Sequence, residues 1–445
     1  MLLFLLACPA IDDQEHAERF DLDGDGVPWP EDCDDADPQV SPEADEICDD
    51  GLDNDCDEDP RDCQLEGELG VGEASWTADG SADSYLGWSL ATADLDRDGA
   101  PDLAAGAPNL DQVYVYLGPV EGADWTFEGP EGSAFGIDLA AVEGWVAVGA
   151  PGLDRVYTYE DGVEVGLVDL WQVDASSGFS VALDAQQTLA LSAPMTSEER
   201  GEVYLVQPPL VDELQVGGRV IGEPGERIGN HVALADLDGD GASELLFSST
   251  TASDFAGQVW ACPGSELELS TLDCDSLALG EEADYLGARL ELDDLDQDGH
   301  VDLIVGVSGY DGGLGAVAFF PGPLDGERLL DDAQALMLGA ASGDRMGSGL
   351  ALVDLDGDGA SEVLTGSLGA STSQPGRAAL HEAPFEGLMD YEQSRLRIEG
   401  PRETGFGFSL AGGELNGEGR ADLVVAAPLV DEATGRIWLF RGEDI

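Results

Sequence analysis

The stretch LGWSLATADLDRDGAPDLAAGAP, residues 86–108, decides the fold because its parts recur along the chain. A glycine follows an apolar or small residue, and after it come an alternating segment, an Asp-rich turn, a second apolar segment and a turn of small residues. Self-similarity at a spacing of 42 to 60 residues indicates a repeat architecture. The seven repeats begin at Gly87, Gly136, Gly178, Gly229, Gly287, Gly347 and Gly407.

The segments inside each repeat have the pattern of strands. They alternate with period two, as in residues 113–116, or form short apolar runs, as in residues 302–305, and stretches of helical periodicity are almost absent. This pattern disfavours a helical solenoid, the competing architecture at this spacing. The spacing is that of one four-stranded blade with variable loops. The sequence therefore predicts an all-β fold, a seven-bladed β-propeller over residues 73–445.

The ends of the repeat region predict how the ring closes. The last repeat stops after its third strand, residues 437–440, whereas an unassigned strand, residues 74–77, precedes the first repeat. We expect residues 74–77 to complete the last blade, because pairing the two ends leaves no open sheet edge.

The repeats resemble FG-GAP repeats, the units of the propeller in the headpiece of integrin alpha subunits. The resemblance rests on Phe135-Gly136, Phe406-Gly407, Gly106-Ala107-Pro108 and Gly149-Ala150-Pro151. It implies calcium in some blades, ions that stiffen one face, and loops on a propeller face that hold a protein or glycan partner in an adhesion-type role.

Four repeats share the loop Asp-x-Asp-x-Asp-Gly-x-x-Asp/Glu between their first two strands. Alternate residues of such a tight loop point into one concavity, and Ca²⁺ binds six to eight oxygens. The residue at position 7 can offer its backbone carbonyl, so His300 needs no imidazole contact. The predicted calcium ligands are Asp94, Asp96, Asp98, Ala100 and Asp102; Asp236, Asp238, Asp240, Ala242 and Glu244; Asp294, Asp296, Asp298, His300 and Asp302; and Asp354, Asp356, Asp358, Ala360 and Glu362.

The other three repeats depart from this loop. The seventh keeps the spacing but carries Glu414 and Asn416 ahead of Asp422, so a weak or absent site is expected. The second and third repeats lack the loop and should have short turns without metal.

The acidic segment at residues 9–63 is a separate module. Residues 12–63 hold 23 acids and little apolar material, so only disulfides and metal could order the segment. It resembles the Cys/Asp-rich metal-binding motif of secreted bacterial proteins. Asp21, Asp23 and Asp25, ahead of Gly26, are expected to form a calcium loop, with a disordered acidic tether as the alternative.

The cysteines and the first residues point to an extracytoplasmic protein. Residues 1–8 are apolar and end in Leu5-Leu6-Ala7-Cys8, which resembles a lipobox and predicts lipidation of Cys8 and a lipid anchor at the outer membrane or cell surface. The other six cysteines fit disulfides. Cys262 and Cys274 are expected to pair, while three connectivities stay open for Cys33, Cys48, Cys56 and Cys63.

The composition restricts the function further. A net charge of −77 excludes most nucleic-acid binding. It also leads us to expect bound cations that reduce the self-repulsion of the folded chain. Adaptation of the surface for solubility or salt is the alternative explanation of the excess acidic residues. Four histidines and no nucleophile or zinc motif argue against an enzyme. The sequence predicts a monomeric binding module. A polysaccharide-processing enzyme that uses carboxylates on the propeller face, and a calcium-dependent surface coat component, are the alternatives.

Overall fold

The structure, a computed structural model, divides the chain into two compact units. Residues 66–444 make up one unit and residues 1–65 belong to the other. The structure describes residues 67–120, 122–170, 175–213, 216–263, 268–369, 374–417 and 419–442, with isolated positions between 22 and 56. Among these described residues, no helix is long and apolar enough to cross a membrane.

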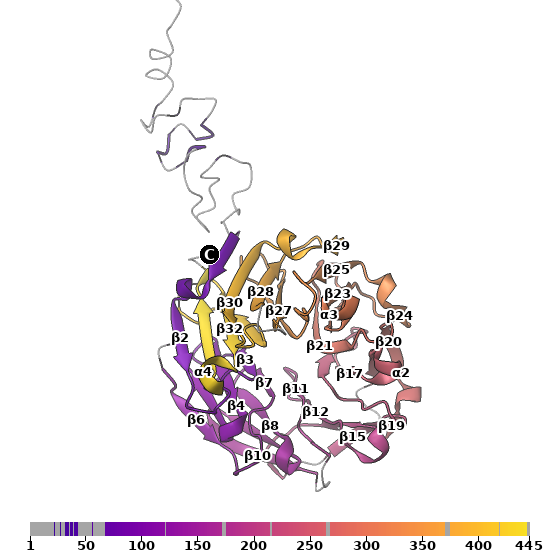
Figure 1. The fold of residues 1–445 in the computed structure, drawn as a ribbon. Helices are drawn as coiled ribbons and strands as arrows, with labels where there is room; N and C mark the ends of the chain where they lie inside the picture. The colour runs from indigo at the N-terminus through magenta and orange to yellow at the C-terminus, as the bar shows by residue number, and fades with distance from the viewer. Residues whose placement is uncertain are drawn as a thin grey trace, which may run out of the picture. The chain divides into compact units, whose positions relative to one another are not determined.

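The larger unit is a ring of seven antiparallel sheets, as predicted (Figure 1). In each blade the second strand is flanked by the first and the third, and the fourth lies outside the third. The first four blades are β3–β6 (Leu90–Ala93, Asp102–Ala107, Gln112–Tyr116, Trp125–Glu128), β7–β10 (Leu139–Val142, Trp145–Ala150, Arg155–Glu160, Val163–Asp169), β11, β12, β13 and β15 (Val181–Leu183, Leu189–Ala193, Glu202–Val206, Val216–Ile221), and β16, β17, β18 and β20 (Val232–Ala235, Glu244–Ser249, Gln258–Cys262, Asp275–Leu279).

The remaining three blades follow the same order. They are β21, β22, β23 and β25 (Leu286–Asp293, Asp302–Val307, Ala316–Phe320, Ala335–Leu338), β26, β27, β28 and β30 (Gly349–Val353, Glu362–Ser367, Pro375–His381, Leu396–Arg402), and β31, β32, β33 and β2 (Ser409–Gly413, Asp422–Ala427, Arg436–Phe440, Trp76–Asp79).

Contacts between blades explain the glycines of the repeat. A Cβ on Gly106 of the first blade would lie 2.1 Å from the carbonyl oxygen of Gly136, which starts the second blade. In the next pair of blades, a Cβ on Gly149 would lie 2.1 Å from the carbonyl oxygen of Gly178. The backbones of neighbouring blades thus touch where a side chain cannot fit, and hydrophobic clusters such as the one around Phe135 fill the space between blades.

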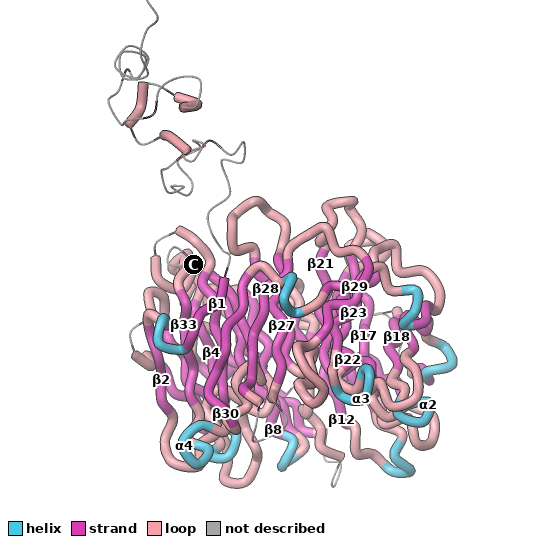
Figure 2. Tube along the Cα trace, turned by 45° about the horizontal axis from the view of Figure 1, so that its top comes forward, coloured by secondary structure: helices cyan, strands magenta, loops and turns pink. Residues whose placement is uncertain are grey.

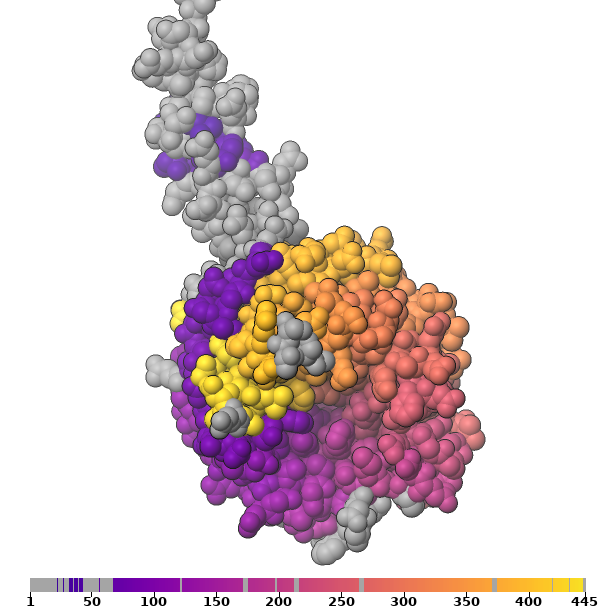
Figure 3. All heavy atoms as spheres, viewed as in Figure 1, coloured from indigo at the N-terminus to yellow at the C-terminus, as the bar shows by residue number. Residues whose placement is uncertain are grey.

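The predicted closure of the ring is confirmed. β2 pairs antiparallel with β33, from Trp76 opposite Leu439 to Asp79 opposite Arg436, two residues later than expected at each end. An ion pair joins the side chains of Arg436 and Asp79. Figure 3 shows the indigo residues that begin the propeller lying against the yellow residues that end it.

Five blades carry a fifth, parallel strand that the sequence did not predict. We call these strands latch strands. Four of them come from the connection between the third and fourth strands of one blade, and the fifth, β1, precedes the outer strand β2 of the seventh blade. Each pairs with the outer strand of the preceding blade in the ring. The latch strands are β14 (Asp212–Glu213) on β10, β19 (Leu269–Ser270) on β15, β24 (Arg328–Leu329) on β20, β29 (Gly387–Met389) on β25, and β1 (Gly67–Gly70) on β30.

The latch strand β1 corrects the predicted start of the propeller. The sequence placed that start at residue 73, but β1 begins at Gly67 and pairs with Leu396 to Glu399. A strand of four residues followed at once by a turn has too little periodicity to be recognised. In the turn after it, the Glu73 carboxylate accepts from the backbone N–H of Gly70, as Asp273 accepts from Ser270 after β19.

The disulfides agree with the sequence and add one pairing. Cys262 pairs with Cys274, as expected, and closes the connection that contains the latch strand β19. In the N-terminal unit Cys33 pairs with Cys56, whereas Cys48 and Cys63 lie outside the described residues.

Truncation tests how much the ring depends on β1 and β2. A chain that begins at Glu66 keeps both strands and should unfold at a midpoint close to that of the full chain. A chain that begins at Gly80 loses them, and with them Trp76, which packs on Tyr116 at 5.1 Å between ring centroids. Loss of a packed Trp costs about 3–5 kcal/mol, and further loss comes from two unpaired edges. We expect a midpoint lower by about 10 °C or more in thermal denaturation, and equal midpoints would contradict this.

Candidate metal centres

The four acidic loops connect the first and second strands of blades one, four, five and six, where Asp side chains fold the loop by accepting backbone hydrogen bonds. In the first loop, Asp94 Oδ1 accepts from the N–H of Asp98 at 3.1 Å and Asp94 Oδ2 from that of Gly99 at 3.0 Å. Gly99 has φ +98°, a conformation that glycine adopts without strain. The other three loops repeat the bond from position 6 to position 1.

Three carboxylates converge in each loop. Within each group, one oxygen from every residue lies within 4.8 Å of the others. Positions 1, 3 and 9 meet in three loops, whereas positions 1, 3 and 5 meet in the fourth. The groups are Asp94, Asp96 and Asp102; Asp236, Asp238 and Glu244; Asp294, Asp296 and Asp302; and Asp354, Asp356 and Asp358.

Two buried oxygens in these loops have no hydrogen-bond donor. Asp294 Oδ1 and Asp354 Oδ1 are enclosed by protein and accept no hydrogen bond. Buried oxygens normally find a partner, and a hard divalent cation supplies one. The donor set is all oxygen, so the loops fit a cation of this kind.

The residue at position 9 also holds the loop together. Asp302 is fully buried and accepts from the backbone N–H of Leu295 at 2.9 Å and of Gly322 at 2.7 Å. Burial raises the pKa of Asp302, which these two N–H groups lower in part. Burial raises the pKa of Glu362, at the same position, to about 8. A bound cation would favour the ionised forms of both.

The residues at position 7 help to fold the loop through their backbone N–H groups. Their backbone N–H groups donate to the carboxylate at position 5, at 2.7 to 2.9 Å, in Ala100, Ala242, His300 and Ala360. That their carbonyls bind a metal stays a prediction. His300 is exposed, and the acidic group of its loop consists of Asp294, Asp296 and Asp302.

Among the described residues, the convergent acidic groups belong to blades one, four, five and six. In the seventh blade, the side-chain amide of Asn416 donates to Asp422 Oδ1 at 2.9 Å. In the second blade, two residues join β7 to β8. Asp21, Asp23, Asp25 and Cys8 lie outside the described residues.

The opposite face of the ring has a different chemistry. The acidic loops follow the first strand of their blades. In every blade, the connections into the first strand and from the second to the third strand therefore lie on the other face (Figure 2). These connections expose large apolar side chains, each 38 to 54% accessible. We call this surface the apolar face; it comprises Leu110, Leu153, Phe179, Met195, Phe255, Tyr285 and Leu429.

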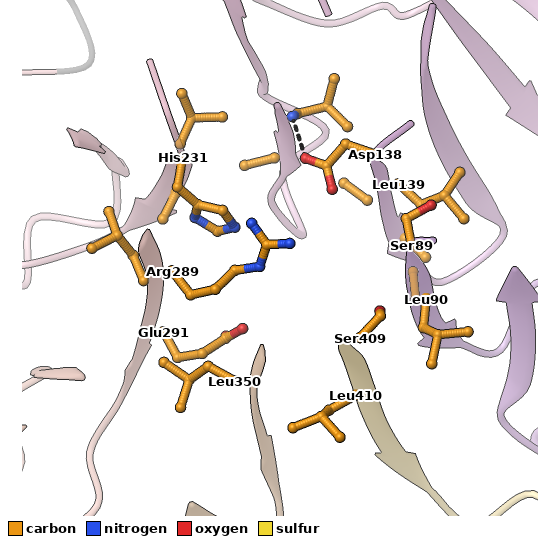
Figure 4. A pocket seen from close by; sticks show the side chains of 18 of the residues that line it. Ser89, Leu90, Asp138, Leu139, His231, Arg289, Glu291, Leu350, Ser409 and Leu410 are labelled. Carbon is orange, nitrogen blue, oxygen red and sulfur yellow. Dashed lines mark hydrogen bonds between the residues drawn. The ribbon is translucent and has the colours of Figure 1, made fainter. Parts of the chain in front are cut away.

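The centre of the ring holds ionisable residues that sequence reasoning missed. The first strands of the seven blades line a cavity of about 300 Å³, and Asp138, His231, Arg289 and Glu291 face it (Figure 4). Alignment of the repeats on their starting glycines would have revealed them, because they occupy positions where other repeats have Ser, Gly or Ala.

Comparisons with known proteins agree with this architecture. The FG-GAP repeat family matches residues 86–120 and 406–440, and the family described as "Putative metal-binding motif" matches residues 32–59. The chain is similar to mouse integrin alpha-IIb, with 29% identity over 45% of this chain and 20% of the relative. It is also similar to human integrin alpha-10, with 34% identity over 25% and 10%, and to integrin alpha pat-2 of Caenorhabditis briggsae, with 25% identity over 45% and 18%.

These matches identify FG-GAP repeats and integrin alpha homologues, with a metal-binding motif ahead of the propeller. The aligned region spans a fifth or less of the length of these relatives.

Two substitutions distinguish the stability that comes from hydrogen bonds within the loop from the stability that comes from a bound cation. In chelator, Asp302→Ala should lower the free energy of unfolding by about 2 kcal/mol or more, because two buried N–H groups lose their acceptor. Asp296→Ala, at an exposed position, should change it by about 0.5 kcal/mol or less. In saturating divalent cation both variants should fall below the parent chain. Urea denaturation in both conditions is the measurement, and equal losses in chelator would refute the dual role of Asp302.

Proposed function

We propose that this chain is a calcium-loaded binding module of the cell envelope, with ions on one face of the propeller and a protein or glycan partner on the other. The observation that carries the proposal is the division of the ring into two faces, one with four groups of convergent carboxylates and one with exposed apolar side chains. The chain is not proposed to be an enzyme.

Calcium is the cation that suits these loops best. Each offers only oxygen donors from a short, turn-rich segment, and Ca²⁺ accepts such flexible oxygen sets, whereas Mg²⁺ requires near-octahedral geometry and keeps its waters. The chain also carries 94 acids against 17 basic residues, so the bound cations offset part of the self-repulsion of the folded state.

The apolar face is the surface proposed for the partner. Phe255 of blade four and Tyr285 at the start of blade five lie 5.7 Å apart between ring centroids, and both are more than a third exposed. Aromatic side chains of this kind provide contact area at a low cost in conformational entropy. Met195, 54% exposed on the neighbouring blade three, adds an adaptable contact.

The N-terminal segment gives the proposal its location. Lipidation of Cys8 would anchor the chain, and the acidic motif, with the Cys33–Cys56 disulfide, would form a metal-binding stalk ahead of the propeller. Disulfides in both units suit an oxidising, extracytoplasmic compartment. The chain is proposed to act there as a monomer.

The calcium part of the proposal is tested with a chain that begins at Glu66, so that the N-terminal motif adds no ions. Millimolar calcium should raise its melting temperature well above that in chelator, because a ligand that binds only the folded state stabilises it by mass action. Native mass spectrometry should count four calcium ions. The double variant Asp236→Asn with Asp238→Asn should bind three.

Two results would overturn the calcium assignment. One is a melting temperature and a mass that do not change between calcium and chelator. The other is a loss of stability in the double variant without loss of an ion, which would make the carboxylates structural only.

The partner surface is tested with two matched double variants. Phe255→Asp with Met195→Asp alters the apolar face, whereas Leu272→Asp with Leu388→Asp adds the same charge at exposed apolar residues near the latch strands. The fluorescently labelled parent chain should bind envelope preparations that carry surface protein and glycan. The first variant should bind about tenfold more weakly, a loss of about 1.4 kcal/mol, and the second should bind as the parent does.

Equal binding by the parent and both variants would place the partner elsewhere. Turnover of an acidic polysaccharide by the parent chain would replace the binding-module proposal with the carboxylate-enzyme alternative.

A further inference from the structure

The ionisable residues at the centre of the ring occupy equivalent positions in different blades. Counted from the starting glycine of each repeat, the second residue lines the central cavity in six blades and the fourth residue in five, because side chains alternate along a strand. The residues at the second position are Ser89, Asp138, Ser180, His231, Arg289, Gly349 and Ser409. Three blades thus replace a small side chain with an ionisable one.

The fourth position shows a sharper departure. It is Ala in six repeats and Glu in the fifth, the set being Ala91, Ala140, Ala182, Ala233, Glu291, Ala351 and Ala411. Six blades therefore pack around the ring with only a methyl side chain at this position. Its packing does not require the Glu291 carboxyl group.

Burial makes these side chains costly. Burial raises the pKa of Glu291 to about 8, and burial, with a smaller effect of Arg289, lowers the pKa of His231 to about 3. Burial also raises the pKa of Asp138, which the charge of Arg289 lowers in part. A group of ionisable residues that raises the cost of folding without improving the packing is a candidate for a binding site.

The hydrogen bonds within the group are incomplete. Among the described residues, Arg289 makes no ion pair, and its guanidinium has one long hydrogen bond, of 3.4 Å, to the carbonyl of Ala288. The Nδ1 atom of His231 is buried and has no partner. Asp138 accepts from the backbone N–H of Val181 at 2.9 Å and turns toward the cavity beside Arg289 (Figure 4).

We propose that the central cavity binds a small zwitterion of the amino-acid class, whose carboxylate pairs with Arg289 and whose ammonium group lies between Asp138 and Glu291. The guanidinium offers the planar pair of donors that a carboxylate accepts. Asp138, across the cavity, and Glu291, on the same strand as Arg289, accept from an ammonium group.

Other simple ligands fit this arrangement less well. An anion alone would face two carboxyl groups, and a cation alone would face Arg289. These residues also form no group of convergent metal ligands. A volume of about 300 Å³ is at the lower end for ligand pockets and suits a molecule of this size. The first strands, not the acidic loops or the apolar face, make this site, so it does not rest on the proposed function.

The test uses three molecules of matched shape on the full chain in saturating calcium. L-Alanine carries both charges, propionate lacks the ammonium group and ethylamine lacks the carboxylate. Ligand-detected NMR and calorimetry should show saturable binding of L-alanine with a Kd of about 1 mM or tighter. Propionate and ethylamine should each bind at least about tenfold more weakly, the equivalent of about 1.4 kcal/mol.

Variants that restore the residue of other blades locate the binding. Glu291→Ala introduces the alanine of the six other repeats, while Asp138→Ser and Arg289→Ser introduce the serine found at the second position of three. Each should weaken binding of L-alanine at least about tenfold, with a melting temperature close to that of the parent. Arg345→Ser, which removes an exposed arginine outside the cavity, should leave binding unchanged.

Each contrary outcome overturns the proposal. If L-alanine does not bind, or if propionate or ethylamine binds equally well, the cavity is not a zwitterion site. The same holds if Arg345→Ser weakens binding as much as Arg289→Ser does. These results leave the calcium loops and the apolar face untouched, so they can be told apart from failure of the proposed function.

Discussion

Pairing between β2 and β33 is the interaction on which the rest of the propeller depends. Without it, the seventh blade would lack its outer strand and the ring its junction. The latch strand β1 shows that this junction is extensive. It pairs with β30 of the sixth blade, as the latch strand from a complete seventh blade would. The two ends of the propeller therefore lie where other blades have the connection between their third and fourth strands. Two pairings, β1 with β30 and β2 with β33, join the N-terminal strands to the last two blades.

The extreme charge of the chain is managed in two ways. All 17 basic residues are arginine, and several join two acids at once, as Arg377 does with Asp344 and Glu399. A planar guanidinium suits such bridges better than an ammonium group. The acidic loops have too few arginines for this, and their carboxylates converge on one another instead. The cation binding proposed for these loops would thus be part of the electrostatics of the fold.

The sequence predicted the features whose physical cause is local. Glycines recur because neighbouring backbones touch there, as at Gly106 and Gly136, and the acidic loops recur because their spacing shapes a tight turn. Cys262 and Cys274 were close enough to pair by proximity. The latch strands were missed because most have two or three residues. The central cavity was missed because Asp138 and Arg289 are far apart in sequence and meet only through the ring.

A repeat protein contains its own comparison, and this gives the central cavity its significance. At one position in seven copies of the same strand, six residues are alanine, so the fold places no demand there for a carboxyl group. Glu291 nevertheless lies half-buried in the cavity, beside Arg289 on its own strand and across from Asp138. An ionisable side chain that lies in this cavity in one repeat alone raises the free energy of folding without a role in the packing of the blade. Such side chains concentrate at functional sites. The acidic loops occur in similar form in four blades, whereas the cavity, asymmetric by sequence, can recognise a ligand that has two different ends.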